Sequence, residues 1–185
     1  ALDNVDFTLR KGEIHALMGE NGAGKSTLMK VLTGINDFEA GEIRVDGIEG
    51  AVKNHSTQDA QNVGISTVYQ EVNLCPNLSV AENLYIGREP MTPLRTIDRK
   101  TMIKKADELV KRLDIKVDVT QNLENYSLAI QQMIAIARAS DMDCKVLILD
   151  EPTSSLDDSE VEKLFKVMNQ LKSEGVGIIF VTHFL

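Results

Sequence analysis

One stretch of eight residues constrains the fold of this chain more than any other. Residues 19–26 read Gly-Glu-Asn-Gly-Ala-Gly-Lys-Ser and match the pattern GxxxxGK[ST] of a phosphate-binding loop. An apolar run, residues 14–18, precedes the loop, and a predicted helix follows it from Lys25 to Gly34. Glycines let successive backbone N–H groups face one point, and the positive end of the helix faces the same point. The loop therefore predicts a site for nucleotide phosphates between a buried strand and a helix.

The side chains of this loop have separate tasks in the predicted site. Lys25 brings a full positive charge to the β- and γ-phosphates, and the hydroxyl of Ser26 can ligate Mg²⁺. The residues expected to contact the nucleotide are those of the loop and the residue that follows it: Gly19, Glu20, Asn21, Gly22, Ala23, Gly24, Lys25, Ser26 and Thr27.

A second apolar run ends in two adjacent carboxylates. Residues 146–149 are Val-Leu-Ile-Leu, and Asp150 and Glu151 follow them. In a phosphate-loop fold, an acid at this position holds the Mg²⁺ water shell, and we assign that role to Asp150. Glu151 then suits the orientation and deprotonation of the attacking water. The guanine-reading motif NKxD is absent from the sequence, which argues against a GTPase-type site.

Hydrophobic periodicity predicts an α/β fold with a mostly parallel sheet, because strands alternate with helices outside the middle of the chain. The predicted strands are residues 5–9, 14–18, 42–45, 65–69, 145–149 and 176–181, with a turn at Asp46-Gly47. We expect a P-loop core, residues 1–70 and 141–185, that includes an N-terminal antiparallel β portion. Residues 71–140 form an inserted helical subdomain in this interpretation.

Caps and apolar spacing define the predicted helices. Ser79 and Asp98 each precede a helical segment in the middle of the chain. The helix after Asp98 presents one apolar face, made of Met102, Ala106, Leu109, Val110 and Leu113. A later helix, ending before Gly175, presents another apolar face, made of Val161, Leu164, Phe165, Met168 and Leu171.

Charge and composition exclude several classes of function. The formal charge is −8 and the isoelectric point is about 4.9, which disfavours a general affinity for nucleic acid or for anionic membranes. No apolar run approaches the roughly 18 residues that a membrane-spanning helix needs. Cys75 and Cys144 lie in no metal-binding cluster, so we expect free thiols in a reducing compartment.

With these motifs in place, the chain resembles the nucleotide-binding subunits of ABC transporters. Gln70 is similar to the Q-loop glutamine, and His183 is similar to the switch histidine that contacts the γ-phosphate. Ser155, Leu156 and Asp157 resemble the D-loop, which crosses a dimer interface. The resemblance implies ATP and Mg²⁺ as cofactors. It implies a catalytic set of Glu151, His183, Gln70 and Lys25, and a metal set of Ser26, Gln70 and Asp150.

Within that family the chain looks most like bacterial sugar importers with two fused ATPase halves, of the ribose, galactose and galactofuranose type. Residues 69–74, 76–84 and 182–185 carry this likeness. It implies an N-terminal half, truncated at both ends, without the adenine-stacking aromatic that the family places upstream. The partners implied are a second ATPase half, membrane permease subunits and, indirectly, a sugar-binding protein, but no nucleic acid. The expected location is the cytoplasmic face of the bacterial plasma membrane.

One region departs from the family pattern. The signature LSGGQ aligns with residues 126–130, Tyr-Ser-Leu-Ala-Ile, which keep Ser127 and lose both glycines. In the family this loop reaches the partner's ATP, and side chains on Leu128 and Ala129 should hinder that approach. The resemblance therefore implies two unequal ATP sites, one complete and one weak or silent.

Alternatives remain open at this point. The chain could be an ABC ATPase of a DNA or ribosome-associated system, although it lacks sustained heptads between Lys25 and Ser127. It could also be a regulatory half with little hydrolysis. A groove around Leu74, Pro76, Leu78 and Leu84 is expected to receive a helix of the membrane subunit, although its apolar residues could equally belong to the core.

Overall fold

The computed structural model describes residues 2–20, 22–69 and 74–182. Their contacts divide into two compact units. One contains the described residues of 1–70, 142–152 and 172–185, and the other contains those of 71–141 and 153–171. Residues 153–171, which the sequence analysis placed in the P-loop core, thus lie in the second unit.

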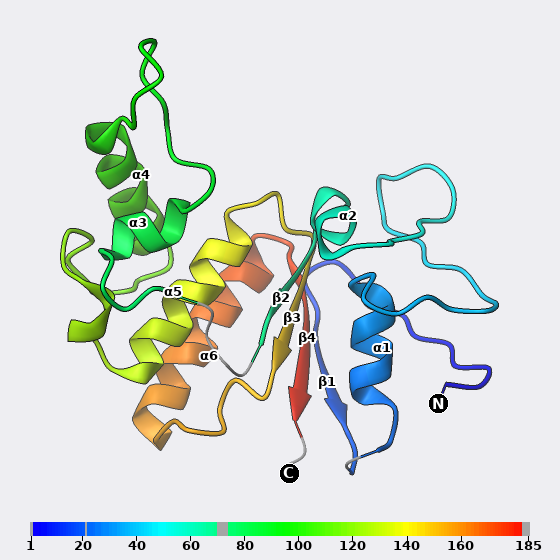
Figure 1. The fold of residues 1–185 in the computed structure, drawn as a ribbon. Helices are drawn as coiled ribbons and strands as arrows, with labels where there is room; N and C mark the ends of the chain where they lie inside the picture. The colour runs from blue at the N-terminus through cyan, green and yellow to red at the C-terminus, as the bar shows by residue number, and fades with distance from the viewer. Residues whose placement is uncertain (1, 21, 70–73, 183–185) are drawn as a thin grey trace. The chain divides into compact units, whose positions relative to one another are not determined.

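A four-stranded parallel sheet forms the first unit. The strands are β1 (Ile14–Met18), β2 (Ile65–Val68), β3 (Val146–Asp150) and β4 (Gly177–Thr182), in the order β1-β4-β3-β2. All four point the same way in Figure 1. The runs Leu147–Leu149 and Ile178–Ile179 are almost fully buried, as expected for central strands covered on both faces. The predicted α/β class with a parallel sheet is confirmed.

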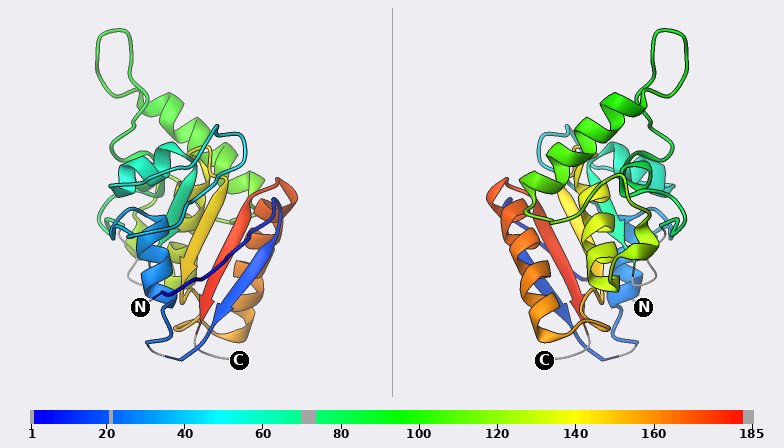
Figure 2. Two further views of the ribbon diagram at one scale, coloured as in Figure 1. Left: turned by 90° about the vertical axis from the view of Figure 1, so that its right-hand side faces the viewer. Right: turned by 90° about the vertical axis from the view of Figure 1, so that its left-hand side faces the viewer.

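Helix α1 (Lys25–Leu32) covers one face of this sheet (Figure 2). Its Met29 is buried in a cluster with Ile148 and Ile179, and Leu32 packs against that cluster. The helix ends at Leu32 rather than Gly34, because Gly34 adopts a left-handed φ of 72°. A Cβ atom on Gly34 would lie 2.8 Å from backbone atoms of Ser56, so the close approach of two backbone segments requires glycine here.

A short helix, α2 (Thr57–Asn62), precedes β2 and was not predicted. The side chain of Ser56 caps it by accepting a hydrogen bond from the backbone N–H of Asp59 at 3.1 Å. Within the helix only Ala60 is buried. A polar hexamer with one apolar contact gives almost no periodic signal, which explains the omission.

The predicted strand at residues 5–9 is wrong, because these residues form no strand. Phe7 and Leu9 nevertheless pack against the buried cluster of the sheet, whereas Val5 is 55% exposed. The alternation of apolar residues therefore indicated which side chains point toward the core, but it did not indicate that the segment pairs as a strand. The antiparallel portion consists, in the part of the first unit that the structure describes, of one isolated bridge between Ile43 and Val52.

The second unit is helical. It contains α3 (Val80–Tyr85), α4 (Arg99–Arg112), α5 (Leu128–Ser140), most of α6 (Asp158–Ser173) and a 3-10 turn, η1 (Leu123–Asn125). Ser79 and Glu82 form a reciprocal capping box at α3, and Asp98 caps α4. Both caps confirm the sequence analysis. No helix among the described residues combines the length and apolar character needed to cross a bilayer.

The predicted apolar face of α4 is confirmed, since all five of its residues are buried. The predicted face of α6 is partly wrong. Leu164, Met168 and Leu171 are fully buried, but Phe165 is 38% exposed and Val167 is buried in its place. Positions 164, 167, 168 and 171 follow the i, i+3, i+4, i+7 spacing of one helix face, and position 165 lies at its edge.

Candidate nucleotide site

The phosphate loop connects the end of β1 to the start of α1. Gly22 and Gly24 adopt left-handed backbone conformations, with φ of 88° and 93°. Gly24 is also the N-cap of α1, and it caps the helix without a side chain. The first i to i−4 hydrogen bond of α1 runs from the N–H of Leu28 to the carbonyl of Gly24 at 2.9 Å. The preceding amides, of Lys25, Ser26 and Thr27, therefore face the open end of the helix, where anions bind.

Lys25 lies across the loop that it follows. Its ammonium donates hydrogen bonds to the carbonyl oxygen of Gly19 and, at 3.0 Å, to that of Glu20. These bonds keep the positive charge at the mouth of the loop. The role of Lys25 as the cation that faces the phosphates stays a prediction.

The two adjacent carboxylates stand at the end of β3, next to β4 in the sheet. Asp150 is the last residue of β3, and its register partner on β4 is Val181. The N–H of Glu151 donates to the carbonyl of Val181 at 2.9 Å, and Glu151 adopts a left-handed φ of 47°. That conformation costs a non-glycine residue about 1–2 kcal/mol, so the hydrogen bond to β4 holds Glu151 in a strained position.

The electrostatics of this edge fit a divalent cation. Burial raises the pKa of the Asp150 carboxyl above its ordinary value, the neighbouring Glu151 carboxylate raises that pKa further, and the charge of Lys25 lowers it. Two adjacent carboxylates thus lie at a partly buried edge of the sheet, and the positive charge of Lys25 offsets their negative charge only in part. The hydroxyl of Ser26 and the carboxylate of Asp150 are the hard oxygen donors that Mg²⁺ prefers. Among the described residues, no three or more His, Cys, Asp or Glu side chains form a group that could hold a metal ion.

Parallel pairing brings the predicted motifs to one edge of the sheet. Met18, just before the loop, pairs with Thr182, and Asp150 pairs with Val181. The carboxyl ends of parallel strands are where α/β proteins bind nucleotides. Gln70, His183 and Asn21 of the predicted site lie outside the described residues.

The D-loop residues have local structural roles in the second unit. The carboxylate of Asp157 accepts a hydrogen bond from the N–H of Glu160 at 2.8 Å, and the N–H of Asp157 donates to the carboxylate of Glu160 at 3.3 Å. The bond from the N–H of Glu160, followed by a hydrogen bond from the side chain of Ser159, lowers the pKa of the Asp157 carboxyl. Ser155 is exposed, and the N–H of Leu156 donates to Thr153 at 3.3 Å. Asp157 is therefore the N-cap of α6, a role that the sequence analysis missed although the pattern Asp-x-x-Glu signals it.

The degenerate signature forms the start of α5. Ser127 caps this helix by accepting a hydrogen bond from the N–H of Ile130 at 3.4 Å. Leu128 is 50% exposed, whereas Ala129 is 1% exposed. The sequence analysis expected both side chains to obstruct an approaching phosphate. Because Ala129 points into the core of its unit, the obstruction falls on Leu128 alone.

The predicted coupling groove needs a correction at Leu84, which is fully buried and belongs to the core. Pro76 is exposed, and Leu74 and Leu78 are half-buried. Asn83, which the sequence analysis did not select, fixes this loop. Its amide accepts from the N–H of Cys75 at 2.7 Å and donates to the carbonyls of Cys75 and Ser79 at 2.9 and 3.0 Å.

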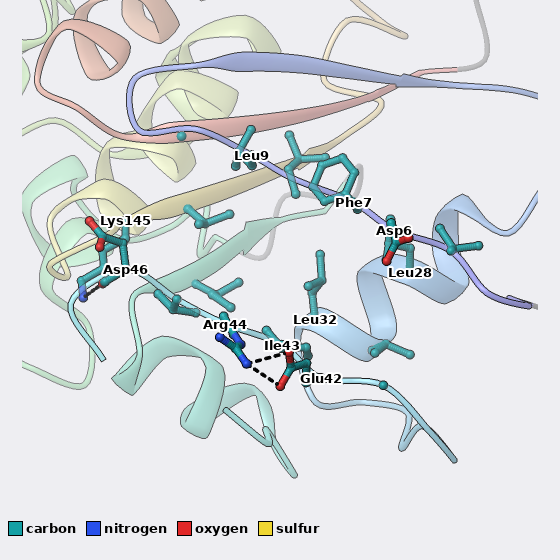
Figure 3. Close-up of a pocket in the computed structure, with 18 of the residues that line it drawn as sticks. Asp6, Phe7, Leu9, Leu28, Leu32, Glu42, Ile43, Arg44, Asp46 and Lys145 are labelled. Atoms are coloured by element: carbon teal, nitrogen blue, oxygen red, sulfur yellow. Dashed lines mark hydrogen bonds and ion pairs between the residues drawn. The ribbon is translucent and has the colours of Figure 1, made fainter. Parts of the chain in front are cut away.

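A cleft of about 1330 Å³ in the first unit is distinct from the predicted phosphate site (Figure 3). Of the predicted nucleotide contacts that the structure describes, only Thr27 lines this cleft. Apolar side chains such as Phe7 and Leu32 form its wall, together with the carboxylates of Asp6 and Glu42, and Arg44 pairs with Glu42 at 2.9 Å. This lining repels a triphosphate. The predicted nucleotide site is a separate place, the phosphate loop and the strand edge described above.

Both cysteines are free thiols, as predicted. Burial raises the pKa of Cys144 to about 11, and its thiol donates to the carbonyl of Val146 at 3.3 Å. This thiol is therefore a structural group with little reactivity at neutral pH.

Comparison with known proteins agrees with this geometry. A family model described as ABC transporter matches residues 2–154. The galactofuranose transporter ATP-binding protein YtfR of Escherichia coli strain K12 is 57% identical over the whole chain, which covers 36% of that protein. The fructose import ATP-binding protein FruK of Bifidobacterium longum is 53% identical, again over the whole chain and 36% of the relative.

Solved structures that resemble this chain are also parts of ABC transporters. The chain matches CbiO1 of Clostridium perfringens, part of an ABC transporter complex, with a TM-score of 0.80 and 29% identity, covering 100% of this chain and 72% of that one. An ATP-binding cassette in its ADP conformation gives a TM-score of 0.85 at 24% identity, covering 100% and 76%. The chain spans about a third of the length of the curated relatives that it matches. By the family match and by the fold, the chain belongs to the ABC transporter family.

Proposed function

We propose that this chain binds ATP with Mg²⁺ and hydrolyses it, as one ATPase half of an importer for a sugar. One observation carries the proposal: the phosphate loop with Lys25 and the carboxylate pair Asp150 and Glu151 follow strands of one parallel sheet and end at one edge. Relatives named as galactofuranose, fructose and ribose import proteins support the sugar as cargo.

The residues of this edge divide the work. The loop amides and the ammonium of Lys25 bind the phosphates and offset the charge that develops when water attacks the γ-phosphate. Glu151 orients that water and accepts its proton. Ser26 and Asp150 hold Mg²⁺, which neutralises phosphate charge when bound. Gln70 and His183 are proposed to contact the γ-phosphate side of the site, which the family resemblance implies.

The proposed transporter contains further subunits. A second ATPase half contributes its signature to the site built on Lys25, and the D-loop residues Ser155 to Asp157 meet that half. Permease subunits receive the motion, and a sugar-binding protein delivers the cargo. The location is the cytoplasmic face of the plasma membrane. In this proposal the parts that move are the predicted core, residues 1–70 and 141–185, and the predicted helical subdomain, residues 71–140, with residues 153–171 grouped with the subdomain by their contacts.

The reciprocal site, built on the signature of this chain, is weak in the proposal. The exposed Leu128 stands at the first turn of α5, where a glycine signature would leave the backbone open. Hydrolysis is therefore concentrated at the site that contains Lys25 and Glu151.

Calorimetric titration of the chain with MgATP tests the proposal. Binding in the micromolar to submillimolar range is expected, and Lys25→Ala should weaken it by at least about a hundredfold, because the charge-assisted phosphate bonds are lost. Lys30→Ala is the matched control, since Lys30 is exposed on the same helix and should leave affinity unchanged. Equal affinities for Lys25→Ala and the unmodified chain would reject the assignment of the loop.

A further inference from the structure

An exposed apolar hairpin lies between α3 and α4. We call residues 90–98 the 90–98 hairpin; an antiparallel bridge joins Met91 to Ile97 within it. Met91 is 57% exposed, Leu94 87% and Ile97 50%. Leu94 is the most exposed large hydrophobic side chain that the structure describes. In Figure 1 this segment extends as a loop beyond the end of α4.

The polar groups of the hairpin are largely bonded to one another. The N–H of Thr92 donates to the carbonyl of Thr96 at 2.8 Å, and the N–H of Asp98 donates to that of Pro90 at 2.7 Å. The hydroxyls of Thr92 and Thr96 lie 2.8 Å apart and share a hydrogen bond. Pro90 and Pro93 have no N–H to satisfy. Removing this tip from water therefore leaves few unbonded polar groups, which keeps the desolvation cost low.

The surroundings of the hairpin are basic although the chain as a whole is acidic. Residues 88–105 contain six Arg or Lys and two Asp or Glu, a formal charge of +4, in a chain of −8. Arg95, Arg99 and Lys100 are exposed, and no acidic residue occurs from position 90 to position 97. Cations thus stand directly beside the apolar side chains.

We propose that the 90–98 hairpin contacts an anionic phospholipid surface. Met91, Leu94 and Ile97 enter the headgroup region, and the neighbouring cations bind lipid phosphates. Buried apolar side chains and neighbouring cations each favour binding to an anionic membrane surface, and two such signals together bind more strongly than either alone. The net charge of −8 disfavours a general attraction to such surfaces, so the contact depends on this segment. The inference goes beyond the proposed function and does not depend on ATP.

Vesicle sedimentation of the 185-residue chain without nucleotide tests the proposal. One set of vesicles contains phosphatidylcholine and phosphatidylglycerol in equal parts, and the other contains phosphatidylcholine alone. Binding is expected to the first set only, and it should weaken as salt rises because screening reduces the attraction. Absence of binding to anionic vesicles at low salt would overturn the proposal, whatever the outcome of the ATP titration.

Two pairs of variants separate the apolar and the electrostatic contributions. Leu94→Asp should reduce binding about tenfold or more, and Ile35→Asp, at a side chain 49% exposed in the other unit, should not. Arg95→Asn with Lys100→Gln should also reduce it about tenfold or more, unlike Lys163→Gln with Lys166→Gln on α6. Equal losses in variant and control would contradict the assignment to the hairpin.

A photo-crosslinker at position 94 of the assembled transporter identifies what the hairpin touches. Attachment to lipid is the expected result. Attachment to permease protein without lipid would overturn the proposal and assign the hairpin to a protein interface. Leu94 is so exposed that its replacement should leave the fold intact, and circular dichroism of each variant checks this.

Discussion

The starts of α1 and α5 make opposite use of the same structural feature. Both are helix N-termini, whose first N–H groups have no partner within the helix, and the family resemblance implies that both approach a nucleotide phosphate. Gly24 caps α1 with a left-handed backbone and no side chain. At α5 the side chain of Ser127 bonds to the N–H of Ile130, and Leu128 beside it is half exposed. We therefore expect phosphate to bind at α1, where no side chain covers the amides, more strongly than at α5.

The largest expected effect concerns the site at α1. Glu151→Gln in the assembled transporter should keep MgATP binding and slow hydrolysis by about 10²- to 10⁴-fold, since the general base is lost. Steady-state ATPase measurements with purified transporter check this, and nucleotide binding serves as the control for folding. If half of the activity remained, the site completed by α5 would be active, and the contrast between the two helix ends would be wrong.

A smaller effect, in the opposite direction, should come from opening the start of α5. In the Glu151→Gln background, Leu128→Gly should raise the residual hydrolysis several-fold, because the helix end is no longer covered, and Leu128→Ala should raise it less. ATPase rates across this series of side-chain sizes are the measurement. A flat series would show that Leu128 does not obstruct the second site.

The smallest expected effect is on stability. Ser127→Ala removes the N-cap of α5 and should lower the free energy of unfolding by about 1 kcal/mol. Urea denaturation of the chain measures this, and Ser155→Ala, at an exposed serine, is the matched control, with a change expected within about 0.5 kcal/mol. Equal stability in both variants would mean that Ser127 is kept for contact with ATP and not for capping.

The sequence predicted the buried elements better than the exposed ones. The bounds of β1 were predicted to the residue because its apolar run stops at a glycine, and Ser79 and Asp98 gave reliable starts for α3 and α4. The segment at residues 5–9 shows the limit of such reasoning. Period-two burial is shared by a paired strand and by an extended segment that packs side chains on a core, and only the partner's hydrogen bonds distinguish them.

The candidate site shows a similar division. The spacing of the phosphate loop specified Lys25 and Gly24, because backbone geometry admits few alternatives there. It could not reveal that Ala129 is buried while Leu128 is exposed, or that Asp157 caps α6, since these depend on the direction of each helix face in the fold. The left-handed conformation of Glu151 carried no sequence signal either, because glutamate is not a residue that favours it.

That conformation has a consequence for variation at position 151. Glycine or asparagine would adopt the same backbone geometry at lower cost, so a chain optimised for folding alone would replace Glu151. Glu151 therefore lowers the stability of the fold, and we expect that its role in the reaction is what keeps a carboxylate at this position. Selection for thermal resistance and selection for turnover should draw this single residue in opposite directions.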